Sequence, residues 1–202
     1  MNKKLILASQ SPRRQALLTQ LGYQFEIIVS DIDESLKPDE LPADYVLRLA
    51  KEKALHAFAL SDNKVNSLVL GSDTSVVCQG QVLGKPENEA DSIKMLSLLS
   101  GNQHQVLTAI AVVGQEQGIE QVFTKLVTTE VYFKALTLTE MQQYWQTGEP
   151  QDKAGSYAIQ GIAGQFIKSI QGSYSAVVGL PLYECAQLLT EAGMAPSISV
   201  ST

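Results

Sequence analysis

The chain has 202 residues and a formal net charge of −6, with 45% hydrophobic and 18% charged residues. This length suits one α/β domain with a substantial core, or two small lobes that share a cleft. No apolar run approaches the roughly 20 residues that a membrane span needs, and the negative charge argues against a broad nucleic-acid-binding surface. Cys78 and Cys185 are the only cysteines, which fits a reduced cytoplasmic protein without a disulfide framework or a zinc motif.

The first predicted elements are a strand, a turn and a helix. Leu5–Ala8 is an apolar run typical of a buried strand, Ser11 is a residue type that caps helices, and a proline opens the predicted helix Pro12–Leu21. Arg13 and Arg14 lie in its first turn, where a cation costs about 0.3–1 kcal/mol. Two interpretations follow: a phosphate-type anion site built from N–H groups, hydroxyls and guanidinium groups, or two solvated arginines on a surface helix.

The remaining elements follow from hydrophobic periodicity and turn residues. We expect strands at residues 25–29, 68–77, 82–83, 106–113, 122–133, 166–170 and 176–178. We expect helices at residues 43–61, 89–99, 139–147 and 181–192, the third capped by Thr139. The interleaving predicts an α/β fold with a mixed, largely antiparallel central sheet flanked by helices, and two lobes around a cleft. One domain is expected over residues 1–194, followed by a loose tail over 195–202.

Lys53 interrupts the apolar stripe of its own predicted helix. At 100° per residue the lysine falls at the centre of the stripe formed by Val46, Leu49, Ala50 and Ala57. Because a buried unpaired ammonium is costly, the side chain either extends to solvent or points at a negative group in a cleft.

Two acidic residues, Asp73 and Glu34, also have two possible interpretations each. Asp73 lies in the middle of a predicted strand, where a carboxylate must be hydrogen-bonded, paired with a cation or bound to metal. It is either an acid in a turn between two short strands, or a metal ligand or general base. Glu34 ends an acidic loop, which is either simply solvated or a source of oxygen ligands, with Asp73, for Mg²⁺ or Mn²⁺.

Two further segments carry weaker signals. Lys85 stands between Gly84 and Pro86 on a turn, where it is either a hairpin end or a point charge for a phosphate. The small residues of segment 152–161 let a ligand approach the backbone, and Gln160 could read a base edge through its amide, although an ordinary glycine-rich connector explains the pattern equally well. The two histidines, His56 and His104, have no partner pattern, and we expect structural roles for both.

Together these segments resemble the Maf family of nucleoside triphosphate pyrophosphatases. The similar segments run in order over nearly the whole chain: LASQSPRR (7–14), Asp33-Glu34, RLAKEKA (48–54), GSDT (71–74), GKP (84–86), DKAGSYAIQG (152–161) and GSYSAVVGLP (172–181). The ordered set is far more specific than any one segment.

The resemblance implies a Maf/ITPase-like fold, a divalent metal (Mg²⁺ or Mn²⁺), and hydrolysis of a nucleoside triphosphate to monophosphate and pyrophosphate in the cytoplasm. It assigns catalysis to Asp73, as a base or as a metal ligand beside Glu34, the metal-site residue, and phosphate binding to four residues: Ser9, Arg14, Lys53 and Lys85. It assigns the choice of base to Arg13, Thr74 and Gln160, which match the dTTP/UTP-hydrolysing subgroup. Gln10, where a smaller residue is common, is the one mild departure.

The resemblance also sets the expected partners. The substrate is a nucleotide, neither nucleic acid nor a membrane is bound, and a homodimer is usual for the family. The alternative in another class is a nucleotide-binding regulator of septum formation with little catalysis. The presence of a carboxylate that could activate water favours the enzyme, since a pure binder has no need of one.

Overall fold

The computed structural model describes residues 3–195, which form two compact units. The first unit takes in Met1–Asp73, Thr108–Val127 and Gly179–Thr202, and the second Thr74–Leu107 and Thr128–Val178. Three long strands contribute residues to both units: β3 (Ser67–Cys78), β5 (Gln103–Glu116) and β6 (Ile119–Phe133). The expected single domain over 1–194 stays a prediction, and residues 196–202 of the expected loose tail lie outside the described residues.

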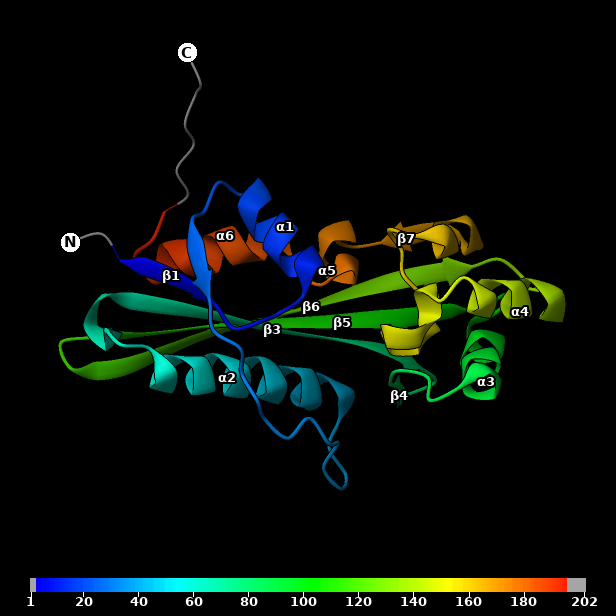
Figure 1. Ribbon diagram of the computed structural model, residues 1–202, viewed down its shortest axis with the longest axis horizontal. Coiled ribbons are helices and arrows are strands. Elements are labelled where there is room, and N and C mark those ends of the chain that lie inside the picture. Colours follow the sequence, from blue (N-terminus) through cyan, green and yellow to red (C-terminus); the bar gives the residue numbers. More distant parts are fainter. Residues whose placement is uncertain (1–2, 196–202) are drawn as a thin grey trace, which may run out of the picture. The chain divides into compact units, whose positions relative to one another are not determined.

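The first unit is a sheet with helices on both faces. Its strand order is β2-β1-β3-β5-β6, and β1 runs parallel to both β2 and β3. Helix α2 covers one face, and α1 and α6 cover the other (Figure 1). Its remaining elements are β1 (Lys4–Leu7), α1 (Pro12–Gln20), β2 (Phe25–Ile27), α2 (Pro42–Leu60), a short 3-10 helix (Lys64–Asn66) and α6 (Leu182–Glu191).

A glycine brings α2 unusually close to β3. A Cβ atom on Gly71 would lie 2.3 Å from the carbonyl oxygen of Ala50 and 2.8 Å from the amide nitrogen of Ala54. Both are backbone atoms of α2, so any larger residue would push the helix away from the strand. This close approach fixes the height of the helix above the strand, and therefore the reach of the α2 side chains that point toward β3.

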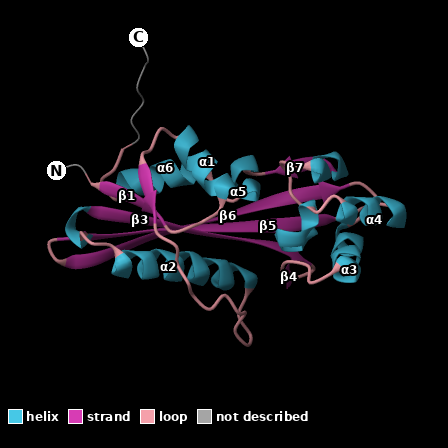
Figure 2. Ribbon diagram, viewed as in Figure 1, coloured by secondary structure: helices cyan, strands magenta, loops and turns pink. Residues whose placement is uncertain are grey.

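The second unit has its own apolar core. In it β4 (Gln81–Leu83) pairs antiparallel with β3, and β7 (Ile167–Gln171) pairs antiparallel with β6. Figure 2 distinguishes these strands from the helices and short helical turns of this part of the chain. The helices are α3 (Glu89–Leu99), α4 (Leu138–Gln146) and α5 (Tyr174–Val178), and the 3-10 turns span 149–152, 154–156 and 162–166. The core includes four aromatic side chains from the segment Thr128–Val178: Phe133, Tyr144, Tyr157 and Phe166.

The fold class predicted from sequence is confirmed, since parallel and antiparallel pairs share a sheet flanked by helices. Two local predictions are wrong. The segment predicted as a strand at 176–178 is helix α5, because the Ser173 hydroxyl accepts a hydrogen bond from the Ala176 amide and starts a helical turn. Helix α4 is capped by Thr137 and not Thr139, because Thr137 and Glu140 form a reciprocal capping box.

Candidate active site

The strand–turn–helix at the N-terminus is built as the sequence predicts. The Ser11 side chain caps α1 by accepting from the Arg14 amide at 3.5 Å. Ser9, buried two residues after β1, accepts hydrogen bonds from the Ser11 amide (3.2 Å) and from Nη1 of Arg14 (3.3 Å). Arg14 is therefore held against its own turn and is not a solvated surface arginine. Arg13 precedes it on α1 and is half-buried.

A backbone carbonyl connects this turn to the strand that carries Asp73. The carbonyl oxygen of Gly179 accepts from Nε of Arg14 at 2.9 Å and from the Ser72 hydroxyl at 3.0 Å. Ser72 is fully buried and immediately precedes Asp73 on β3. The shared acceptor fixes the Arg14 guanidinium beside Asp73. The sequence predicted no role for Gly179, which belongs to the segment 172–181 that resembles the Maf family.

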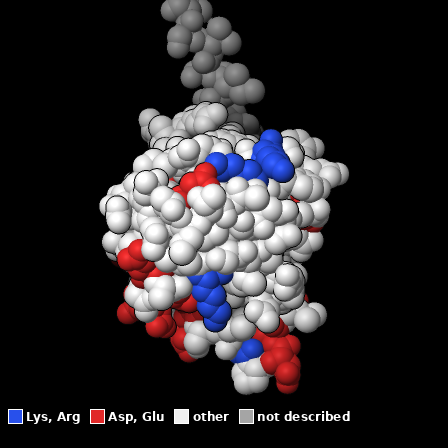
Figure 3. All heavy atoms as spheres, turned by 90° about the vertical axis from the view of Figure 1, so that its right-hand side faces the viewer, with Lys and Arg blue, Asp and Glu red and all other residues white. Residues whose placement is uncertain are grey.

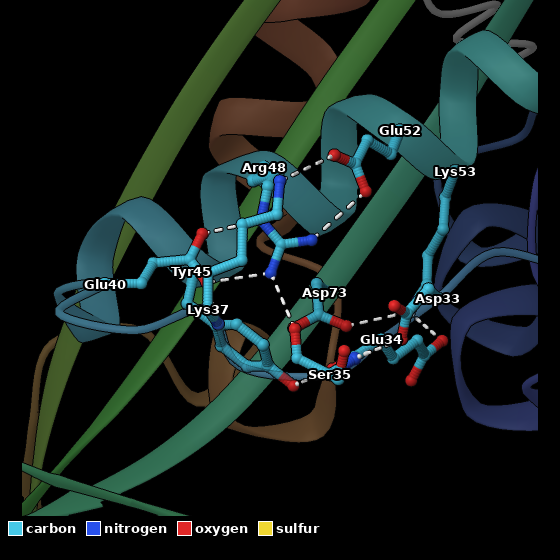
Figure 4. Close-up of polar contacts among 10 residues, drawn as sticks. All are labelled: Asp33, Glu34, Ser35, Lys37, Glu40, Tyr45, Arg48, Glu52, Lys53 and Asp73. Atoms are coloured by element: carbon cyan, nitrogen blue, oxygen red, sulfur yellow. Dashed lines mark hydrogen bonds and ion pairs between the residues drawn. The ribbon is translucent and has the colours of Figure 1, made fainter.

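Lys53 forms the centre of the charged cluster. Its ammonium lies 2.8 Å from Oδ1 of Asp73 and 2.7 Å from Oε1 of Glu34, and it reaches them from α2 across the gap that Gly71 keeps narrow (Figure 4). The Lys53 and Asp73 side chains are each 10% exposed, whereas that of Glu34 is 54% exposed. The sequence left open whether Lys53 extends to solvent or points at a negative group. In the structure the side chain points at two carboxylates.

The acidic loop that carries Glu34 is anchored on α2 by Arg48. The guanidinium binds the Glu40 carboxylate with two hydrogen bonds, 2.6 Å from Nε and 2.8 Å from Nη2, and also donates to the Ser35 carbonyl at 3.0 Å (Figure 4). The Tyr45 hydroxyl donates to the Glu34 carbonyl at 2.8 Å. A two-pronged contact of this kind fixes orientation as well as distance, so the loop presents Glu34 to Lys53 from a fixed backbone.

The electrostatics of the cluster follow from burial and from these pairs. Burial lowers the pKa of the Arg14 guanidinium, and the nearby charges of Asp73 and Glu34 partly offset that effect. The hydrogen bonds from Arg48 lower the pKa of Glu40 to about 2, so the anchor of the loop stays charged at neutral pH. Arg14 and Lys53 together carry two positive charges, which Glu34 and Asp73 balance.

Glu34 and Asp73 are oxygen donors of the kind that a hard divalent cation takes, and Mg²⁺ is typically bound by one or two carboxylates together with substrate phosphates. The Lys53 ammonium occupies the point that both carboxylates face. Residues 3–195 contain no group of three or more His, Cys, Asp and Glu side chains placed to hold a metal. Any cation bound here would therefore depend on oxygens from the substrate.

Three predicted site residues belong to the second unit. Thr74 follows Asp73 on β3 and is half-buried, while Lys85 and Gln160 are exposed. The Gly155 amide donates to the Gly84 carbonyl at 3.0 Å, so the turn that carries Lys85 lies against the segment that leads to Gln160. The structure thus groups Ser9, Arg14, Glu34, Lys53 and Asp73 within the first unit, and the Lys85 and Gln160 segments within the second.

Two further findings concern the surface charge and the length of the helices. The face shown in Figure 3 carries only scattered Lys and Arg side chains and no continuous basic patch. No helix between residues 3 and 195 is long and apolar enough to cross a bilayer.

His104 is buried, and its Nε2 atom lies 2.8 Å from the Tyr157 hydroxyl. Burial lowers the pKa of His104 to about 4, as suits a structural histidine. Arg48, Glu40 and Tyr45 are the contributors that sequence reasoning missed, although Arg48 opens a segment with family resemblance.

Comparisons with known proteins find relatives along nearly the whole chain. The family described as Maf-like protein matches residues 4–192. A dTTP/UTP pyrophosphatase of Colwellia psychrerythraea is 64% identical over 199 residues, covering 98% of this chain and 92% of that one. A dTTP/UTP pyrophosphatase of Vibrio parahaemolyticus is 57% identical over 187 residues, covering 93% and 96%. Among solved structures, the Ham1 protein of Staphylococcus aureus has 14% identity and a TM-score of 0.41, covering 81% and 91%, a likeness too weak to carry an argument.

Proposed function

Because this chain belongs to the Maf family, we propose that it hydrolyses dTTP and UTP to the nucleoside monophosphate and pyrophosphate. One observation carries the proposal. In a chain that is 64% identical to a dTTP/UTP pyrophosphatase, a buried lysine lies between two carboxylates, with an arginine held nearby by Ser9 and Gly179. The names of the relatives support this enzyme and give no support to the alternative of a regulator with little catalysis.

In the proposed reaction, water attacks the α-phosphorus of the triphosphate. Asp73 accepts the proton of that water at Oδ2, because Oδ1 is held by Lys53. A new P–O bond forms at the α-phosphorus, the bond to the bridging oxygen breaks, and pyrophosphate leaves with the electron pair. Arg14 and Lys53 stabilise the negative charge that develops on the leaving group, and we assign Ser9 and Lys85 to further contacts with the phosphates.

A divalent cation, Mg²⁺ or Mn²⁺, completes the proposal. Glu34 would hold it together with phosphate oxygens, and Asp73 would be a second ligand only in the alternative in which it is not the base. The cation would supply charge neutralisation for the phosphate oxygens. The charge balance of the cluster supports this role, since the two carboxylates offset Arg14 and Lys53 and leave no positive surplus for a highly charged triphosphate. The cation would add the positive charge that this cluster lacks for binding a triphosphate.

Base selection is assigned to Arg13, Thr74 and Gln160. A neutral amide suits the imide edge of thymine and uracil, which offers one donor between two acceptors. A carboxylate in that position would instead meet an acceptor with its negative charge. The family resemblance further supports a homodimer, and the two buried free cysteines, Cys78 and Cys185, are compatible with the cytoplasm as the site of action.

The test is a panel of ordinary and modified nucleoside triphosphates, incubated with the purified protein and Mg²⁺ or Mn²⁺, followed by identification of the products. Monophosphate with pyrophosphate, formed fastest from dTTP and UTP, is the expected result. Asp73→Asn should nearly abolish turnover while leaving the fold intact. Release of diphosphate with single phosphate would refute the proposed reaction, and near-normal activity of Asp73→Asn would exclude Asp73 as the base.

A further inference from the structure

The turn that presents Gln160 is held on both sides by one pair of side chains. Gln160 lies in a tight turn closed by a hydrogen bond from the Gly161 amide to the Ala158 carbonyl at 3.1 Å. We propose that Tyr144 and Glu149 position this turn, and that they thereby set the preference for uracil and thymine over cytosine. The inference rests on the proposed function, because it concerns how that enzyme selects its base.

Glu149 holds the side of the turn that follows Gln160. Its carboxylate accepts hydrogen bonds from the amides of Ile162 (2.8 Å, to Oε2) and Ala163 (3.2 Å, to Oε1). Burial would raise the pKa of Glu149, but hydrogen bonds from Ile162, Tyr144 and Ala163 outweigh it and lower the pKa. The carboxylate is therefore charged at neutral pH, and it binds the two amides directly after the turn.

The residue after Gln160 has to be a glycine for this contact to form. A Cβ atom on Gly161 would lie 2.2 Å from Oε2 and 2.4 Å from Oε1 of Glu149. Real Cβ atoms do not approach other atoms this closely, so a methyl group and the carboxylate cannot share the space. The carboxylate therefore contacts the backbone of the turn itself, and any movement of Glu149 is transmitted to the residue beside Gln160.

Tyr144 holds the other side of the turn. It is 2% exposed, and its hydroxyl donates to Oε1 of Glu149 at 2.7 Å and accepts from the Ala158 amide at 3.3 Å. Burial and the charge of Glu149 both raise the pKa of Tyr144, so the hydroxyl keeps its proton and goes on donating. One phenol and one carboxylate thus tie the backbone before and after Gln160 to helix α4 and the turn at 149–152.

Fixing this turn matters because a glutamine amide is ambiguous. With one orientation it donates to a carbonyl of uracil and accepts from the imide N–H, but turned over it fits the ring nitrogen and amino group of cytosine. Gln160 is exposed, and residues 3–195 give its side chain no hydrogen bond. Discrimination therefore depends on the backbone that presents the amide, since a loosely held turn would let the side chain adjust to either base.

The test compares kcat/KM for UTP with kcat/KM for CTP in purified variants, together with amide hydrogen exchange of residues 158–163. Tyr144→Phe should lower the UTP-to-CTP ratio about 5-fold, the value of one ordinary hydrogen bond. Gly161→Ala should lower this ratio at least as much, because the added methyl group displaces the Glu149 carboxylate from the Ile162 and Ala163 amides. Both should speed exchange of the turn amides. Gly161→Ala should lower the ratio much less in a Glu149→Ala background, where the methyl group has room.

Controls separate positioning from loss of stability. Thr137→Ala removes the capping box at the other end of α4 without touching the turn, and it should leave both the ratio and the exchange of residues 158–163 unchanged. Gln160→Ala sets the ratio expected when the amide is lost. An unchanged ratio in Tyr144→Phe and Gly161→Ala, or in Gln160→Ala itself, would overturn the inference. A wild-type protein that releases no pyrophosphate from UTP or dTTP would instead refute the proposed function.

Discussion

Replacing Lys53 with methionine tests whether the charged cluster is a buried ion pair. Methionine has a similar length and no charge, so it fills the same space on α2. In the native chain the ammonium contacts Asp73 and Glu34 at 2.8 and 2.7 Å, and the Asp73 side chain is only 10% exposed. Lys53→Met would therefore remove the ammonium that is hydrogen-bonded to the buried Asp73 carboxylate and leave Arg14 as the nearby cation, whereas the more exposed Glu34 can regain water.

The size of the effect follows from this difference. Removing one partner of a buried pair costs about 3–5 kcal/mol because the other charge is left uncompensated. Only one of the two carboxylates is buried here, and Arg14 stays near it, so we expect the low end, about 3 kcal/mol of unfolding free energy. The double variant Lys53→Met/Asp73→Asn also removes the buried carboxylate charge, so it should be about 2 kcal/mol more stable than Lys53→Met.

Urea unfolding followed by circular dichroism measures the stabilities, and pyrophosphate release from UTP measures activity. Both variants should be inactive, so the double variant would be close to native stability yet without turnover. A Lys53→Met protein within about 0.5 kcal/mol of wild type, which is the ordinary range for a surface substitution, would refute the burial argument. Retained turnover in that variant would refute the role of Lys53 in the reaction.

Three other predictions concern Arg48, Gly71 and His104. Arg48→Lys keeps the charge but loses the two-pronged contact with Glu40, so the concentration of Mg²⁺ needed for half-maximal activity should rise about 10-fold; an unchanged metal titration would contradict the anchoring role. Gly71→Ala should push α2 away from β3, costing about 1–3 kcal/mol of stability and lowering turnover about 100-fold, and native values of both would show that the approach is not needed. Burial lowers the pKa of His104 from 6.5 to about 4, so the unfolded chain binds a proton first as the pH falls. The free energy of unfolding should fall by about 3 kcal/mol between pH 6.5 and pH 4. Urea unfolding of His104→Gln should show a clearly smaller fall over the same range. Equal falls in the two proteins would contradict the lowered pKa of His104.

Much of the site could be predicted from sequence because local rules place its residues. The Ser11 cap and the proline after it fix the start of α1, and the lysine within an apolar stripe required a negative partner. The two arginines in the first turn of α1 had no local justification, and one of them, Arg14, proves to be held by Ser9 and the Gly179 carbonyl. For Lys53 and Arg14, a violation of a local rule marked a residue that has a partner in a distant part of the chain.

Other features were out of reach of local reasoning. The valine pair at 177–178 favours a strand by propensity, yet the Ser173 cap and tertiary contacts make it part of α5. The contact of Arg48 with Glu40 joins a helix to an irregular loop, and no periodicity predicts the path of such a loop. The carboxylate of Glu149 beside Gly161 is visible only once both backbones are placed, since sequence spacing does not reveal a missing Cβ.

The most direct test of the reaction is to run it in water enriched in oxygen-18 and to locate the label by mass spectrometry. Attack on the α-phosphorus of UTP predicts one labelled oxygen in the uridine monophosphate and none in the pyrophosphate. Label in the pyrophosphate, or in single phosphate released beside uridine diphosphate, would contradict the account.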